Sequence, residues 1–297
     1  MNGAMVDTLV TSFGRTAAQK RGAHESGLRY VQTRAAALRV SDTGGSKPAL
    51  VLTPDGPCVI EHFDGLIRSF SEHFRVICFD MPGTGFSFPN HGYRFGLAET
   101  ADVFVELLDA LSIPKAAFAF TCANGFFAMN LAKRYPQRVS HLVLAQTPSF
   151  ACMRRWTDRN IPGLLRVPYL GQAVTAVTAE VLATRWFNRA LPRGSEHKSG
   201  FVAHTQTALR SGGCFCLASL VQGMLRIQDD DVSGVRCPTL AIHGDSDFSH
   251  AQTDFRSITE AIPHAQVLRF EGCGHFPNLE QASKYADLVL RFLTHTG

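Results

Sequence analysis

Long uncharged hydrophobic runs are missing from this chain of 297 residues. None reaches the ~20 residues that a helix needs to cross a bilayer, so we expect no membrane span. The first twenty residues also lack a continuous apolar stretch, which argues against a secretory signal. We therefore expect a cytoplasmic protein whose eight cysteines are reduced thiols, most of them packed as small hydrophobic side chains.

Charge of either sign is also scarce. Charged residues make up 18% of the chain, and the formal net charge is only +4. Adjacent basic residues occur only at 20–21, 133–134 and 154–155. Such scattered pairs are typical of a solvated surface and not of one that follows a phosphate backbone, so we expect no nucleic-acid partner.

Motifs for metals and cofactors are absent. Cys214 and Cys216 form a C-x-C pair, but no second Cys/His pair stands at the spacing of a zinc site, so the sequence predicts no metal. No glycine-rich phosphate loop or dinucleotide fingerprint is present, and we expect no cofactor.

What the chain does have is a repeated alternation of strand and helix patterns. The hydrophobic content of 45% is ample for a large core. Short connections between these patterns predict an α/β fold with a mostly parallel central sheet flanked by helices. The predicted strands are 28–33, 36–41, 49–53, 75–79, 115–120, 139–146, 239–243 and 266–270. The predicted helices are 62–72, 98–111, 125–135, 253–262 and 279–295.

The alternation stops between residues 149 and 233. This segment is rich in Ala, Leu and Val, is interrupted by Pro and Gly, and has sheet strands on both sides. We interpret it as an inserted helical cap on a core formed by 28–148 and 234–297, because a linker would be more polar. Residues 1–27 are polar and predict a loose N-terminal leader or a short helix.

Three chemically useful side chains follow predicted strands, at the edge of a parallel sheet where ligands bind. Cys122 lies between the strand at 115–120 and the next helix, where the helix dipole and free N–H groups favour a thiolate. Asp247 follows the strand at 239–243, with Asp245 as a second candidate, and His275 follows the strand at 266–270. Each also has a plainer explanation: a packed thiol, an Asp in a turn, and a histidine with ordinary partners.

The segment 120–124 (FTCAN) resembles the nucleophile elbow of the α/β-hydrolase fold, whose usual form is G-x-S-x-G. Here Phe120 and Asn124 stand in place of the two glycines. The order Cys122, Asp247, His275 is similar to the nucleophile–acid–histidine order of that family, and the turn at 80–87 is similar to its D-x-P-G-x-G-x-S. The resemblance covers about 28–293 and implies a cysteine nucleophile served by His275 as base and Asp247 as acid.

The segment that normally carries the oxyanion hole is altered, because 51–57 (VLTPDGP) replaces the usual H-G. By resemblance, the donors would be the backbone N–H groups of Asp55 and Ala123. Loss of such a donor typically raises the activation barrier by ~3 kcal/mol. The Asp55 carboxylate would repel an oxyanion if it pointed inward; otherwise it could orient a substrate amine or hydroxyl, share a proton with His62, or simply form the turn.

Aromatic side chains near the strand ends predict an apolar pocket, and we select Phe63, Phe126 and Trp156, with His62, as substrate-binding residues. The favoured function is acyl transfer through an acyl-thioester: an ester, lactone or thioester hydrolase, or an acyltransferase. The substrate would be a small hydrophobic acyl compound, free or carried on coenzyme A or an acyl carrier protein. Two alternatives stay open: a cofactor-free C–C bond lyase or cyclase, and a non-catalytic small-molecule receptor.

Overall fold

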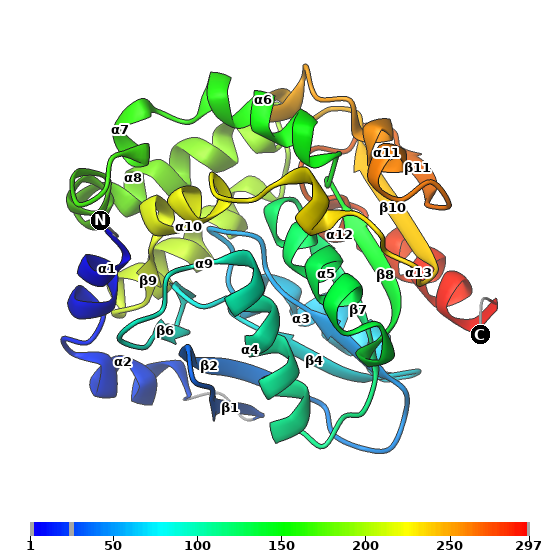
Figure 1. Cartoon of the computed structure of the whole chain (residues 1–297), viewed down its shortest axis with the longest axis horizontal. Helices are drawn as coiled ribbons and strands as arrows, with labels where there is room; N and C mark the ends of the chain where they lie inside the picture. The colour runs from blue at the N-terminus through cyan, green and yellow to red at the C-terminus, as the bar shows by residue number, and fades with distance from the viewer. Residues whose placement is uncertain (1–2, 24–26, 296–297) are drawn as a thin grey trace.

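The computed structural model describes residues 3–23 and 27–295, and a central sheet organises them (Figure 1). The strand order is β1-β2-β4-β3-β7-β8-β10-β11, and β6 pairs with β2. Pairing is antiparallel for β1–β2 and β2–β4 and parallel from β4 to β11. The predicted fold class is therefore confirmed. The strands are β1 (Leu28–Gln32), β2 (Ala36–Asp42), β3 (Ala49–Leu52), β4 (Arg75–Phe79), β6 (Phe88–Pro89), β7 (Ala116–Thr121), β8 (Val139–Ala145), β10 (Thr239–Gly244) and β11 (Gln266–Phe270).

The central strands are continuous apolar runs because both faces of the sheet are covered. All six residues of β7 are buried. Along β3, Leu50 and Leu52 join one hydrophobic core and Val51 joins the other, as the two-residue period of a strand requires.

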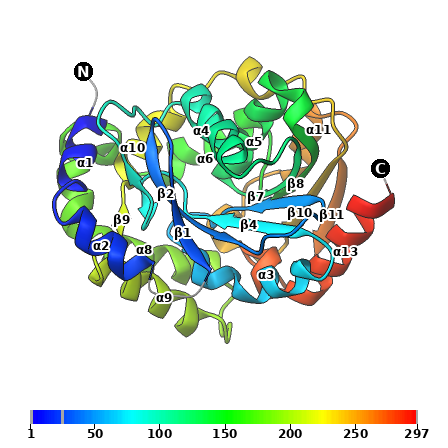
Figure 2. The same cartoon turned by 90° about the horizontal axis from the view of Figure 1, so that it is seen from below.

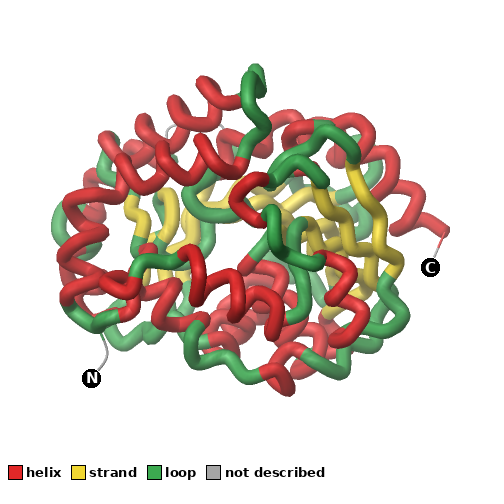
Figure 3. The backbone as a smooth tube through the Cα atoms, turned by 90° about the horizontal axis from the view of Figure 1, so that it is seen from above, coloured by secondary structure: helices red, strands yellow, loops and turns green. Residues whose placement is uncertain are grey.

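Helices cover the two faces in separate groups (Figure 2). One face carries α4 (Leu97–Ala110), α5 (Ala123–Arg134) and α11 (Ile258–Ala261). The other carries α3 (Asp64–Ser71) and α13 (Ala282–His295). Short helical turns complete the core: η1 (Ile60–Phe63), η2 (Pro136–Arg138), η4 (Phe248–His250), η5 (Phe255–Ser257) and α12 (Pro277–Glu280). Viewed from above, helices border the strands on both sides (Figure 3).

The segment between β8 and β10 is mainly helical and lies above the sheet in Figure 1. Its elements are α6 (Phe150–Asn160), α7 (Gly163–Arg166), α8 (Leu170–Ala190), α9 (Lys198–Arg210), β9 (Cys214–Phe215), α10 (Leu217–Met224) and η3 (Asp229–Val232). The two-residue strand β9, which the sequence did not predict, pairs with β5 (Thr84–Gly85) of the core. The boundaries of a cap at 149 and 233 stay a prediction.

The N-terminal leader is helical over its described part. It forms α1 (Ala4–Val10) and α2 (Arg15–Gly22), and α1 packs against α8. Asp7 of α1 is buried, so α1 is packed against the rest of the molecule and does not form a loose leader. Within the described ranges 3–23 and 27–295, no helix is both long and apolar enough to cross a membrane.

Candidate active site

Cys122 occupies a strained turn between β7 and α5. Its φ of 53° and ψ of −124° place a non-glycine residue in a costly region of backbone space. Hydrogen bonds hold it there: the Cys122 N–H donates to Ala145 O (2.7 Å), and Thr147 Oγ1 donates to Cys122 O (2.9 Å). The turn therefore presents the thiol at the helix N-terminus, as the elbow motif predicts.

Asp247 and His275 form a buried, hydrogen-bonded pair. His275 Nδ1 lies 2.6 Å from Asp247 Oδ2, which also accepts from Gln146 Nε2 at 2.8 Å. The other carboxylate oxygen accepts from the Ser249 N–H at 2.8 Å and from Ser249 Oγ. Asp245, in contrast, accepts from the Gly272 N–H, so Asp247 is the acid that orients the imidazole.

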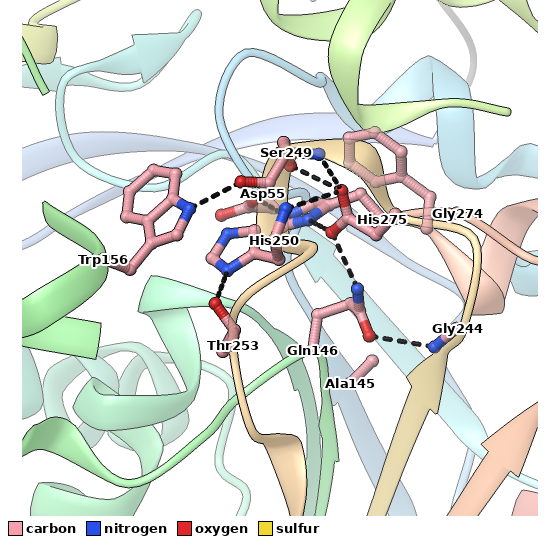
Figure 4. A network of polar contacts seen from close by, with 12 residues as sticks. Asp55, Ala145, Gln146, Trp156, Gly244, Ser249, His250, Thr253, Gly274 and His275 are labelled. Atoms are coloured by element: carbon pink, nitrogen blue, oxygen red, sulfur yellow. Dashed lines mark hydrogen bonds and ion pairs between the residues drawn. The ribbon is translucent and has the colours of Figure 1, made fainter. Parts of the chain in front are cut away.

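Asp55 meets the opposite edge of the same imidazole. Its Oδ2 lies 3.3 Å from His275 Nε2, and its side chain is buried (Figure 4). Among the roles considered for Asp55, the inward orientation is the one that the structure shows. Its partner is His275 and not His62, whose Nε2 lies 3.2 Å from Phe201 O.

Two carboxylates on one buried imidazole set the charges of the site. Burial alone would lower the pKa of His275, but the charge of Asp247, with Cys122 and Asp55, raises it well above its ordinary value. Burial works against the Asp247 carboxylate too, yet the His275 charge lowers its pKa to about 2. The resting state is thus an imidazolium held by Asp247.

For the two remaining acids, Asp55 and Cys122, burial outweighs the opposing charges. It raises the pKa of Asp55, against the opposing charge of His275. It raises the pKa of the Cys122 thiol as well, and the Asp55 charge adds to this rise. His275 and the Ala123 N–H oppose it. Cys122 is therefore a protonated thiol at rest, and His275 can receive its proton only after passing its own Nε2 proton to Asp55.

The thiol opens on a mostly apolar cavity of about 360 Å³ between the core and the helices above it. Asp55, Ala123 and Trp156, three of the residues selected from the sequence, line it. Two arginines, Arg185 and Arg189, are the cationic side chains on its wall among the described residues. A larger depression of about 1320 Å³ near α4 contains no member of the Cys–His–Asp group.

The structure does not place Phe63, Phe126 or His62 among the lining residues of that cavity. Phe63 packs in the core on the α3 side, and Phe126 packs edge-to-face on Phe150 at 5.2 Å. His62 stands against Phe201 at 5.1 Å. Their position near strand ends is as predicted, but that position does not fix the face to which a side chain points.

Residues 48–282 match the family model described as the alpha/beta hydrolase fold. The chain belongs to the α/β-hydrolase family. It is 29% identical over 272 residues to a 2-hydroxymuconate semialdehyde hydrolase from Pseudomonas putida, covering 85% of this chain and 89% of the relative. It is 27% identical to a pimeloyl-[acyl-carrier protein] methyl ester esterase from Nitrosomonas europaea, over 80% of this chain and 92% of that protein.

Solved structures agree on the fold. Epoxide hydrolase A from Mycobacterium thermoresistibile superimposes with a TM-score of 0.76 over 91% of this chain and 98% of that structure. Sequence identity between the two is 16%, so the comparison shows a shared α/β-hydrolase architecture alone.

Several site residues of this α/β-hydrolase escaped the sequence analysis. Gln146 and Ser249 bind Asp247, and Trp186 stands edge-on to His275 at 5.0 Å. His250, stacked on His275 at 5.1 Å, is a fourth. Burial and the nearby charge of His275 lower the pKa of His250 to about 3, so its ring is neutral near pH 7. In the sequence, the one indication that His250 belongs to the site is its position three residues after Asp247.

Proposed function

We propose that this protein is an acyl-transfer enzyme, hydrolysing an ester, lactone or thioester or passing the acyl group to another acceptor, with Cys122 as nucleophile. One observation carries the proposal: the elbow thiol stands beside a buried His275–Asp247 pair joined at 2.6 Å. The Cys122 Sγ lies within 4.8 Å of a ring nitrogen of His275. This proximity supports the roles of nucleophile for Cys122, base for His275 and orienting acid for Asp247 in covalent acyl transfer.

Asp55 gives the first step a proton acceptor. The proton on His275 Nε2 passes to the Asp55 carboxylate, and the Cys122 proton passes to that nitrogen. The raised pKa of Asp55 suits it to hold this proton. Protonation of Asp55 also removes its negative charge from the region where the oxyanion forms.

The remaining steps follow the bonds that change. The thiolate attacks the acyl carbonyl, and the Ala123 and Asp55 N–H groups receive the developing oxyanion. His275 returns its proton to the leaving oxygen or sulfur as that bond breaks, which leaves an acyl-thioester on Cys122. Water or a second acceptor then attacks the thioester and gives its proton to His275, which passes it to the departing Cys122 thiolate. Asp55 finally returns its proton to His275 Nε2, which restores the resting charges.

The cavity favours a hydrophobic acyl group. Met153, Leu220 and Phe127 are among its lining residues, and its volume suits a small molecule. The similarity to a methyl ester esterase supports an ester as the bond that is cleaved. Residues 149–233 would then act as the cap that encloses the acyl chain.

An anionic carrier fits the cavity wall. Arg185 and Arg189 line it; in the described part of the chain neither forms an ion pair with a carboxylate, and Arg189 Nη2 donates to Asn160 Oδ1 at 3.1 Å. A phosphate of coenzyme A or of an acyl-carrier phosphopantetheine would complement them. The esterase relative is named for an acyl-carrier protein substrate, which supports the same class of partner. We place the reaction in the cytoplasm, with no cofactor.

One observation favours a second candidate, a cofactor-free C–C bond lyase or cyclase. Asp55 already occupies His275 Nε2, so proton transfer through the Asp55–His275 pair could proceed without attack by Cys122. A non-catalytic receptor is the third alternative, and it would use the same cavity.

Steady-state turnover separates the three. A panel of short and medium acyl thioesters and activated esters is offered to the wild type, Cys122→Ser and Cys122→Ala. An acyl-transfer enzyme loses nearly all turnover in the alanine variant and changes its substrate preference in the serine variant. Turnover of the panel that is unaffected by Cys122→Ala would sink Cys122 as the nucleophile. No turnover in any form would point to the lyase or cyclase, or, where a ligand still binds, to the receptor.

A further inference from the structure

We propose that Cys122, His250 and His275 form a Zn²⁺ site that competes with substrate for the nucleophile. One ligand atom from each of the three residues, the Cys122 Sγ and a nitrogen of each ring, lies within 4.8 Å of the other two. All three side chains are buried. Thiolate and imidazole are the ligands that zinc prefers. The inference is independent of turnover and goes beyond the proposed function.

The outer hydrogen bonds of both imidazoles match those of metal-binding histidines. His275 Nδ1 pairs with Asp247 Oδ2 at 2.6 Å, and His250 Nδ1 pairs with Thr253 Oγ1 at 3.0 Å (Figure 4). A metal-ligating histidine almost always bonds an oxygen through its other nitrogen, which fixes the ring and its tautomer. Each ring is thus fixed by Nδ1. The Nε2 atom of His275 faces the Asp55 carboxylate at 3.3 Å, and the Nε2 atom of His250 has no hydrogen-bond partner among the described residues.

The Nε2 atom of His250 is the observation that the acyl-transfer chemistry does not explain. It is buried without a hydrogen-bond partner among the described residues, and only 3% of the His250 surface is exposed. A buried nitrogen without a partner costs free energy unless something binds it. Trp156 stacks on the ring at 4.3 Å and 6°, which holds this nitrogen in place beside the thiol.

The distances suit one ion with modest movement. Bonds of about 2.0–2.1 Å to nitrogen and 2.3 Å to sulfur place ligand atoms roughly 3.3–3.6 Å apart in a tetrahedral site. The three atoms therefore need to approach by roughly an ångström. Asp55, which faces His275 Nε2 at 3.3 Å, is near enough to offer a carboxylate oxygen or to hydrogen-bond a water as the fourth ligand.

Zn²⁺ bound in this way would displace two protons to solvent, one from the Cys122 thiol and one from the His275 imidazolium. It would occupy both the nucleophile and the base, so it would block attack by Cys122. His275 and Cys122 alone would give a two-ligand site. His250 supplies the third ligand and is the residue that distinguishes a built metal site from an ordinary reactive thiol.

Equilibrium dialysis of the chelator-treated full-length protein against Zn²⁺ tests the proposal. We expect one tight ion per chain, absent in Cys122→Ala. His250→Phe keeps a ring against Trp156 but removes the ligand, and should weaken the affinity at least ~10-fold, since loss of an outer partner alone costs ~10–100-fold. Thr253→Val removes such an outer partner and should weaken binding by about tenfold.

His73→Phe is the matched control, because His73 is exposed and lies outside the cluster. Co²⁺ provides a spectroscopic check: a thiolate-to-cobalt absorption should appear in the wild type and in His73→Phe, and vanish in Cys122→Ala. If His250→Phe does not fold, as judged by circular dichroism, Thr253→Val carries the same test. Equal Zn²⁺ affinity in the wild type and the folded His250 or Thr253 variant would overturn the proposal, as would tight binding that survives Cys122→Ala.

Discussion

Asp55 is the single residue that most changes the chemistry expected of this site. A carboxylate stands where the family usually has a histidine before glycine, and it is buried against His275. Its charge stabilises the imidazolium and opposes the Cys122 thiolate at the same time. The resting enzyme should therefore be less reactive toward alkylating agents than a cysteine paired with histidine alone.

Replacing Asp55 with Asn should make Cys122 more acidic. Burial of the thiol remains, but the negative charge that adds to its raised pKa is removed. The pH at which alkylation by iodoacetamide reaches half its maximum should fall, measured with chelator present and Cys122→Ala as the blank. Asp245→Asn, an exposed carboxylate in the same region, should leave the profile in place. An unchanged or higher midpoint in Asp55→Asn would contradict this electrostatic account.

Sequence motifs located Cys122, Asp247 and His275 because each depends on local chain geometry at the end of a strand. The partner of Asp55 could not be found in this way, because it lies 220 positions away in the chain. Spacing likewise missed the cluster with His250, which only the fold assembles. His62 illustrates the reverse case, since a nearby position in sequence did not bring it to Asp55.

At the scale of elements, the junction of β7 and α5 depends on the absence of a side chain at 125. A Cβ at Gly125 would collide with the side chain of Thr147, whose hydroxyl holds the Cys122 carbonyl. The elbow therefore needs small residues after the nucleophile for packing reasons as well as for its backbone conformation.

Gly125→Val should destabilise the protein by about 1–3 kcal/mol, the usual cost of overpacking, and should displace the thiol. Gly65→Val is the control, because Gly65 lies in α3 with open space around its Cβ position. It should change the free energy of unfolding by no more than about 0.5 kcal/mol. Urea denaturation of both variants compares them directly, and equal stabilities would refute the packing argument.

A buried ionic cluster links Arg39 of β2 to Asp80, directly after β4, and to Glu61 of η1. Arg39 of β2 is 1% exposed; its Nε donates to Asp80 at 2.8 Å and its two terminal nitrogens donate to Glu61 at 2.7 and 2.8 Å. Asp80 also accepts from the N–H groups of Ile60 and Phe86. The D-x-P-G turn is thus fixed by charge as well as by glycine.

Arg39→Met should cost about 3–5 kcal/mol of stability, because it leaves Asp80 buried without its charged partner. Arg29→Met removes a half-exposed ion pair with Asp42 and should cost less than about 1 kcal/mol. Thermal or urea unfolding measures both. A loss at Arg39 no larger than that at Arg29 would mean that the cluster contributes no more than a surface pair.

At the scale of the whole molecule, the sequence predicts the elements of the central sheet and its helices better than the elements that pack around them. Strand and helix periodicity located the principal sheet strands and the core helices to within a few residues, because their burial is repetitive. It did not reveal β9 or its pairing with β5, since two residues carry no period. Nor did it show that α1 packs against α8, which depends on contacts far apart in the chain.

The volume of the cavity beside Cys122 predicts a limit on the size of the acyl group. Leu220→Trp should fill part of this cavity, lowering kcat/KM for medium acyl chains by about tenfold, equivalent to ~1.4 kcal/mol, with little effect on acetyl substrates. Leu225→Trp, on an exposed and non-lining position, serves as the control. Equal losses for short and medium chains would show that the acyl group binds elsewhere.

Intact-mass spectrometry after incubation with acyl thioesters and activated esters tests the central claim most directly. The account predicts a mass gain of one acyl group that maps to the peptide containing Cys122, is absent in Cys122→Ala, and accumulates when deacylation is slow. Product formation in the wild type with no adduct on Cys122, even under rapid acid quench, and with full turnover retained in Cys122→Ala, would contradict it.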